Sequence, residues 1–285
     1  MRRIGPDFVR HEPPSSLLVL LPGSRYELTV RFVDLSVPLA DDKDWAPRWA
    51  RVKVKRQSHV FGRRVIRFLF RLPGKYLRTG LGWANDELKL GTHSTTHLDA
   101  PWHYAPTSEG APAKTVDQVP LEWCYGDGVV LDMRHKRDGE AVTVEDLATE
   151  LAKIGHTLRP RDIVLIATGG DSRLGTREYF SHGVGVSAEA TRWLLDRGVK
   201  VVGTDAWGWD RPLHLQAKEA KETGRNDVFW AAHFVGVDKE YCQLERLTNL
   251  GALPPTGFKV CCFPLKVAGG SAGPSRVVAM IDDGR

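Results

Sequence analysis

Three histidines and one aspartate lie within the eleven residues that begin at His93 and end at His103. The run reads His93-Ser-Thr-Thr-His-Leu-Asp-Ala-Pro-Trp-His103, so His97 and Asp99 complete the set. Imidazole nitrogens and carboxylate oxygens are ligands that Zn²⁺ and Mn²⁺ accept in proteins. This density of donors predicts a site for one or two divalent ions, with a base beside it.

The spacing of these four side chains predicts that they share one face of an extended chain. Pro101 rules out a single continuous helix, and it biases Ala100 toward an extended conformation. Side chains alternate along an extended chain, so residues 93, 97, 99 and 103 point the same way. A single histidine in a strand is usually structural, and Asp-x-Pro is common in turns. Four polar residues in phase nevertheless favour a metal site.

A second ion would need ligands from elsewhere in the chain, and His233 and Glu245 are the best candidates. Asp99 has two oxygens and could bridge both ions. Alone, each distant candidate is weak, because His233 could line a helix and Glu245 could be a surface acid. Glu245 lies in the partly apolar segment Cys-Gln-Leu-Glu-Arg-Leu. A free carboxylate would be costly there, which favours a partner for it, although Arg246 competes for that role.

Apolar runs that alternate with capped helices predict an α/β fold with a mixed sheet and flanking helices. Thr143 and Ser187 are suited to cap helices, the first reaching Lys153 and the second ending before Gly198. Strands are expected at 26–38, 128–133, 162–168, 199–205, 258–267 and 276–281, and a further helix at 228–234. Residues 40–58 are expected to be loop-like. After the last of the central strands, a loop around Trp207-Gly-Trp209 and then a polar segment through Asp227 are expected.

At 285 residues the chain fits one domain from residue 26 to 285, preceded by a loosely ordered N-terminal extension, residues 1–25. Leu17 to Leu21 is apolar but far too short to span a membrane. The four cysteines form no disulfide framework, which indicates a reducing compartment and predicts a cytoplasmic protein.

The net charge of +5 does not predict a nucleic-acid partner, because 40 basic residues face 35 acidic ones and the two are mixed along most of the chain. In residues 51–71, basic side chains alternate with or lie among apolar ones. A solvated outer face explains this stretch best, and attraction of an anionic substrate is the other explanation left open.

The run from His93 to His103 resembles the His-x-Gly-Thr-His-x-Asp-x-Pro-x-His signature of the cyclase family, which includes kynurenine formamidase and isatin hydrolase. Three further segments resemble the family in the right order. They are Asp34-Leu-Ser-x-Pro38, Gly203-Thr-Asp205, and His233 followed by Glu245-Arg-Leu-Thr-Asn-Leu-Gly-Ala-Leu-Pro254. One departure is Thr95, which stands where the signature has glycine. Glycine at such a position permits a backbone conformation that a β-branched residue resists.

The resemblance implies a swivelling β/β/α type of α/β fold and a homodimer or homotetramer. It implies metal ligation by His93, His97 and Asp99, and, in members with two ions, by His233 and Glu245. His103 would then be the general acid and base. Isatin hydrolase-like members use Mn²⁺ in this picture, and formamidase-like members use Zn²⁺.

The sequence therefore predicts a metal-dependent hydrolase that cleaves the C–N bond of a small amide with a water activated by the metal. The substrate would be an N-formyl aromatic amine or a cyclic amide. Trp102, Tyr104, Trp207 and Trp209 would form an aromatic pocket, or would belong to ordinary core and loop packing. A lyase or cyclase that uses the same metal, and a non-catalytic metal-stabilised binding protein, are the alternatives.

Overall fold

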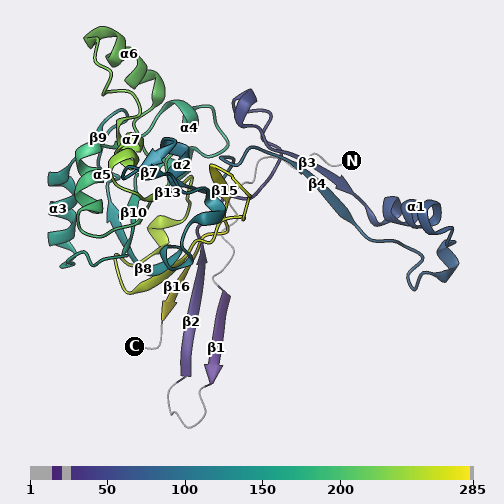
Figure 1. The fold of residues 1–285 in the computed structure, drawn as a ribbon. Coiled ribbons are helices and arrows are strands. Elements are labelled where there is room, and N and C mark those ends of the chain that lie inside the picture. Colours follow the sequence, from purple (N-terminus) through teal and green to yellow (C-terminus); the bar gives the residue numbers. More distant parts are fainter. Residues whose placement is uncertain (1–14, 21–26, 283–285) are drawn as a thin grey trace.

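A ten-stranded mixed sheet runs through the protein, and helices pack against it (Figure 1). The computed structural model describes residues 15–20 and 27–282. Neighbouring strands follow the order β1 (Ser15–Leu20), β2 (Glu27–Asp34), β16 (Val278–Asp282), β14 (Phe258–Cys261), β8 (Tyr125–Asp132), β10 (Ile163–Ala167), β12 (Val201–Thr204), β13 (Cys242–Glu245), β5 (His97–Asp99) and β15 (Ala272–Pro274). The predicted α/β fold with a mixed sheet and flanking helices is confirmed.

Short ribbons and helices complete the described part of the chain. The two-stranded ribbons are β3 (Lys53–Gln57) with β4 (Asn85–Lys89), β6 (Thr107–Ser108) with β7 (Ala111–Pro112), and β9 (Ala141–Val142) with β11 (Gly185–Val186). The α-helices are α1 (His59–Phe70), α2 (Pro101–Tyr104), α3 (Val144–Lys153), α4 (Glu178–Ser181), α5 (Ala188–Leu195), α6 (Leu213–Thr223) and α7 (Ala231–Asp238). The 3₁₀ turns are η1 (Arg48–Ala50), η2 (Gly74–Tyr76), η3 (Val116–Gln118), η4 (Leu121–Trp123), η5 (Gly170–Arg173) and η6 (Leu250–Ala252).

The middle of the sheet is parallel, because β8, β10, β12 and β13 run in one direction. Helices α3 and α5 are the crossovers between β8 and β10 and between β10 and β12. Strand β10 is buried along its whole length, as is typical of a strand covered on both faces. Its side chains alternate between two apolar cores, with Leu165 in one core and Ile166 in the other.

The predicted helix caps are present in the structure. The Thr143 hydroxyl accepts a hydrogen bond from the Asp146 amide, and the Asp146 carboxylate accepts one from the Thr143 amide. Ser187 caps α5 through the amide of Ala190. Gly198 follows that helix with φ +83°, a conformation that favours glycine. These caps set where α3 and α5 begin, and Gly198 lies in the turn between α5 and β12.

Several expected boundaries differ in the structure. Residues 40–58 are not all loop, since β3 begins at Lys53, and the expected helix at 228–234 begins later, at Ala231. The polar segment before residue 227 contains α6, which buries only Gln216 and so has no apolar stripe that predicts a helix. Within the expected N-terminal extension, residues 15–20 form strand β1, which pairs with β2, and its other residues lie outside the described part.

Residues 53–89 form an arm that projects away from the rest of the protein (Figure 1). The antiparallel ribbon of β3 and β4 leads to α1 at its far end. Apolar side chains on this arm face solvent, and Phe68 is 84% exposed. Exposed apolar side chains of this kind mark interaction surfaces. The homodimer or homotetramer expected from the sequence stays a prediction.

No helix within residues 15–20 and 27–282 is both long enough and apolar enough to cross a membrane.

Candidate metal centre

Strands β5 and β13 bring together candidate ligands that are far apart in the sequence. The strands pair antiparallel, with His97 opposite Glu245 and Asp99 opposite Gln243. Directly opposed residues project from the same face of a sheet, and so do residues two apart along one strand. His97, Asp99 and Glu245 therefore share one face, as the alternation in the sequence predicts for the first two. All three side chains are buried.

His93 and His103 reach the same point from two different local structures. His93 lies in the turn that precedes β5, and His103 lies on α2, a single helical turn with Pro101 at its first position. The expected extended chain therefore ends at Ala100, because proline is well suited to begin a helix. The rings of His93 and His103 still pack together, with their centroids 3.9 Å apart.

Buried atoms that have no partner outside the donor set show that this set suits a cation. His97 Nε2 and both carboxylate oxygens of Asp99 are buried, and among the described residues they contact only other members of the set. His93 Nδ1 and His97 Nε2 lie 2.7 and 3.2 Å from Asp99 Oδ1. Ligand atoms of His97, Asp99 and Glu245 all lie within 4.8 Å of one another, as do those of His93, Asp99 and His103. Buried imidazoles and carboxylates that face a common point fit a divalent metal ion.

Hydrogen bonds outside the donor set orient the two histidines that flank Asp99. His97 Nδ1 lies 2.8 Å from the carbonyl oxygen of Thr95, which can accept only from a protonated nitrogen. The proton is therefore on Nδ1, and the lone pair of Nε2 is available to a metal. His93 Nε2 lies 2.9 Å from Ser271 Oγ, so its Nδ1 faces Asp99. The backbone of Thr95 has φ +56°, the left-handed conformation that explains the glycine of the family signature.

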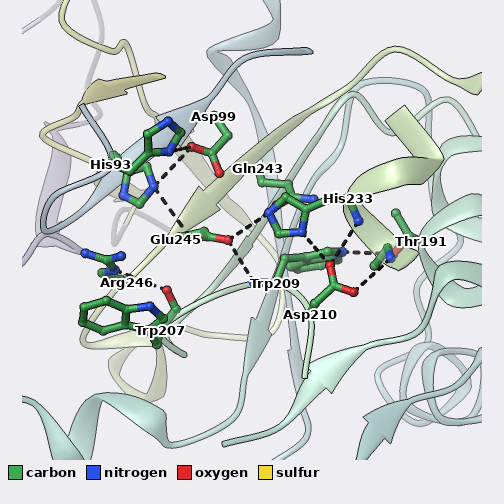
Figure 2. Close-up of polar contacts among 12 residues, drawn as sticks. His93, Asp99, Thr191, Trp207, Trp209, Asp210, His233, Gln243, Glu245 and Arg246 are labelled. Atoms are coloured by element: carbon green, nitrogen blue, oxygen red, sulfur yellow. Dashed lines mark hydrogen bonds and ion pairs between the residues drawn. The ribbon is translucent and has the colours of Figure 1, made fainter. Parts of the chain in front are cut away.

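His233 and Glu245 form the second half of the site, beside an aspartate that the sequence did not indicate. His233 Nε2 lies 3.5 Å from Glu245 Oε1, and His233 Nδ1 lies 2.5 Å from Asp210 Oδ2 (Figure 2). The amides of Ala232 and His233 also donate to the Asp210 carboxylate. Asp210 therefore holds both the start of α7 and the His233 ring. The one signal for it was its place in the loop after β12, since α/β proteins bind ligands beyond the carboxyl ends of parallel strands.

The protonation states in the site follow from burial and neighbouring charge. Burial lowers the pKa of His103 to about 4, although the Asp99 carboxylate opposes this. His103 is therefore neutral at pH 7, in the form that accepts a proton. Burial also lowers the pKa of His233, but hydrogen bonds to Asp210 and Glu245 outweigh it and raise that pKa to about 10. A metal ion held by His233 must displace this proton.

Asp210→Asn is expected to weaken metal binding by about 10- to 100-fold, because the His233 ring loses the acceptor that orients it. Competition with a chromogenic chelator measures this affinity. Asp238→Asn is the matched control, since Asp238 ends the same helix and pairs with Arg192 at the surface. Equal affinities for the two variants would show that Asp210 has no role in the centre.

A pocket of about 530 Å³ opens onto His93, His103, His233 and Glu245. Its aromatic wall is partly different from the predicted one. Trp207 lines the pocket, but Tyr104 and Trp209 are core residues, and Trp102 is largely exposed and is not part of the lining. The aromatic residues that line it are Trp49, Phe180, Trp207, Phe229 and Trp230.

The mixed sheet and the buried imidazoles and carboxylates define an α/β protein with a candidate metal centre. Residues 33–211 match the family model described as a putative cyclase, and the chain belongs to this cyclase family. The predicted resemblance is thereby confirmed.

Relatives in this family carry the names of hydrolases. The kynurenine formamidase of Erythrobacter litoralis is 30% identical over 191 residues, which cover 67% of this chain and 74% of that protein. The isatin hydrolase of Roseibium aggregatum is 25% identical over 217 residues, which cover 73% and 78%. The solved isatin hydrolase A of Labrenzia aggregata, bound to benzyl benzoate, superposes with a TM-score of 0.69 at 26% identity, covering 89% of this chain and 94% of that one.

Proposed function

We propose that this protein is a metal-dependent hydrolase that cleaves the C–N bond of a small aromatic amide. The observation that carries the proposal is the buried pair His97 and Asp99, whose free ligand atoms have no partner outside the donor set and lie beside Glu245, a residue that lines an aromatic-walled pocket. The names of the relatives support an N-formyl aromatic amine or a cyclic amide as the substrate. His93, His97 and Asp99 would hold one ion, and Asp99, His233 and Glu245 a second one.

In the proposed hydrolysis, some residues of the chain bind the substrate and others transfer protons. A Zn²⁺ or Mn²⁺ ion would lower the pKa of a coordinated water toward neutrality and polarise the amide carbonyl. His103 is neutral at pH 7 and packs against His93. Its imidazole takes a proton from the attacking water and gives it to the leaving nitrogen. Trp207 and the other aromatic side chains bind the substrate ring and exclude water from it.

The test combines metal analysis with two substrates. Protein purified without added metal is expected to contain about one to two equivalents of Zn or Mn, and chelation is expected to abolish hydrolysis. Formanilide and isatin represent the N-formyl and the cyclic amide classes, and product formation is followed by absorbance. Folded protein that contains no metal and binds none on titration would contradict the proposal, as would a metal-loaded protein that hydrolyses neither class of amide.

A further inference from the structure

Arg246 carries a buried guanidinium that no acidic side chain neutralises by contact. The residue is 6% exposed, and its Nε donates to the carbonyl oxygen of Trp207 at 3.2 Å. Within residues 15–20 and 27–282, neither terminal nitrogen donates a hydrogen bond or pairs with a carboxylate. Buried charges are usually paired, because burial removes the water that would otherwise stabilise them. A guanidinium with free donors beside a cavity therefore has capacity for a ligand.

The other arginine of the pocket does not have this capacity. Arg211 also lines the pocket, but its guanidinium lies 2.5 Å from the Glu219 carboxylate. The guanidinium of Arg246 instead lies over the Trp207 ring, 3.6 Å from the ring centroid (Figure 2). Stacking on an aromatic face fixes the guanidinium plane and leaves its edge free to bind an oxygen pair.

The backbone holds Arg246 in a strained conformation that aims this side chain. Its φ is +58°, in the left-handed region that is unfavourable for arginine. Its amide donates to Ala206 O at 3.1 Å, and its carbonyl oxygen accepts a hydrogen bond of 2.5 Å from the Thr96 hydroxyl. Strain that surrounding contacts maintain is common at ligand sites.

The free guanidinium adjoins both the candidate metal centre and the aromatic wall. Arg246 follows the candidate ligand Glu245 directly, and both residues line the same pocket. The Trp207 ring that supports Arg246 also contacts Trp49 and Phe180 edge to face, with centroids 6.3 and 5.2 Å away. A ligand in this pocket thus meets aromatic surface and a cation side by side.

We propose that Arg246 binds a carboxylate of the substrate, and that the substrate class is an aryl amide with a carboxylate beside the amide on its ring. This inference rests on the proposed function. The ring packs against the aromatic wall, and the guanidinium forms a two-pronged pair with the carboxylate. The adjacency of Glu245 and Arg246 places that carboxylate near the reacting carbonyl, as an ortho substituent requires.

Binding of two product analogues tests the proposal without turnover. Calorimetry compares 2-aminobenzoate with its uncharged counterpart 2-aminobenzamide, and the wild type is expected to bind the acid at least about 30-fold more tightly. Arg246→Asn removes the guanidinium, and asparagine tolerates the left-handed backbone. This variant is expected to bind both compounds within about threefold of each other, with the affinity for the amide unchanged.

Two further variants provide the controls. Arg211→Asn removes the paired arginine of the same pocket and is expected to keep the preference for the acid. Arg246→Lys keeps the charge but loses the planar fork, so its preference is expected to lie between those of the wild type and Arg246→Asn. Thermal unfolding shows whether each variant is folded. If Arg246→Asn does not fold, the proposal is judged from the preference of Arg246→Lys and from the preference of the wild type for the acid over the amide.

The outcomes separate this inference from the proposed function. A preference for the acid that persists in folded Arg246→Asn would overturn the role of Arg246, and so would a wild type that binds the acid no better than the amide or not at all. Hydrolysis of 2-formamidobenzoate and formanilide is then measured in parallel. If the wild type hydrolyses neither but shows the Arg246-dependent preference, the proposed function fails and the carboxylate site stands. If it hydrolyses both with equal kcat/KM in the wild type and in Arg246→Asn, the carboxylate site fails and the function stands.

Discussion

Asp99→Asn is expected to remove the bound metal and to lower kcat/KM by about 1000-fold or more. Asp99 belongs to both groups of side chains that could hold an ion, and among the described residues its buried oxygens have no partner outside those groups. Three imidazoles, those of His97, His103 and His93, outweigh the effect of burial and hold the pKa of Asp99 well below its usual range. The carboxylate is therefore charged, and an amide of the same shape would present an N–H group to the cation.

Elemental analysis and turnover of formanilide measure this effect. Asp196→Asn is the control, because Asp196 is an exposed aspartate that pairs with Lys239 and belongs to neither group of candidate ligands. The control is expected to retain wild-type metal content and rate. If Asp99→Asn kept a full complement of metal, the ion would have to lie elsewhere, and the assignment of the centre would be wrong.

His103→Ala is expected to lower kcat by about 100- to 10,000-fold while the metal content stays near that of the wild type. The reason is that His103 is neutral at pH 7 and stands at the edge of the donor set, on α2, where it can exchange a proton with a reacting group. Product binding should survive, because the aromatic wall and the candidate metal ligands remain. Steady-state kinetics, with metal analysis of the same preparation, measures both quantities.

His214→Ala is the matched control for this experiment, since His214 is an exposed histidine on α6. A His103→Ala variant that lost its metal along with its activity would identify His103 as a ligand, consistent with its place near His93 and Asp99 but contrary to the role of a base. A non-catalytic binding protein would show a third pattern, in which the substitution leaves ligand affinity largely intact and there is no turnover to lose.

Where strand periodicity decides the geometry, the sequence predicted which candidate side chains share a face. His97 and Asp99 share a face because β5 is a strand, and side chains two apart in a strand always do. The pairing of β5 with β13 could not be derived from local pattern, because register depends on how distant segments pack. Glu245 and His233 were weak candidates on their own, and the resemblance to the cyclase family strengthened their link to the histidine run.

Packing also decided the features that the sequence did not indicate. Asp210 shows its role only when α7 is docked, since its partners are a backbone amide pair and the His233 ring. Trp207 and Trp209 are two residues apart, yet one lines the pocket, and the other is buried with its indole N–H donating to Thr191. Which aromatic ring reaches a cavity depends on the path of the surrounding loop, and that path cannot be predicted from composition.

The arm also gives the bulk charge of this protein an unexpected origin. Residues 53–89 hold ten of the 40 Lys and Arg residues and two of the 35 Asp and Glu residues. Without the arm the chain would hold 30 basic and 33 acidic residues, so the rest of the chain is slightly acidic although the whole chain has a pI near 9.0. Retention on a cation exchanger, or precipitation with a polyanion, would therefore report on one appendage. The isoelectric point of this molecule describes neither of its parts.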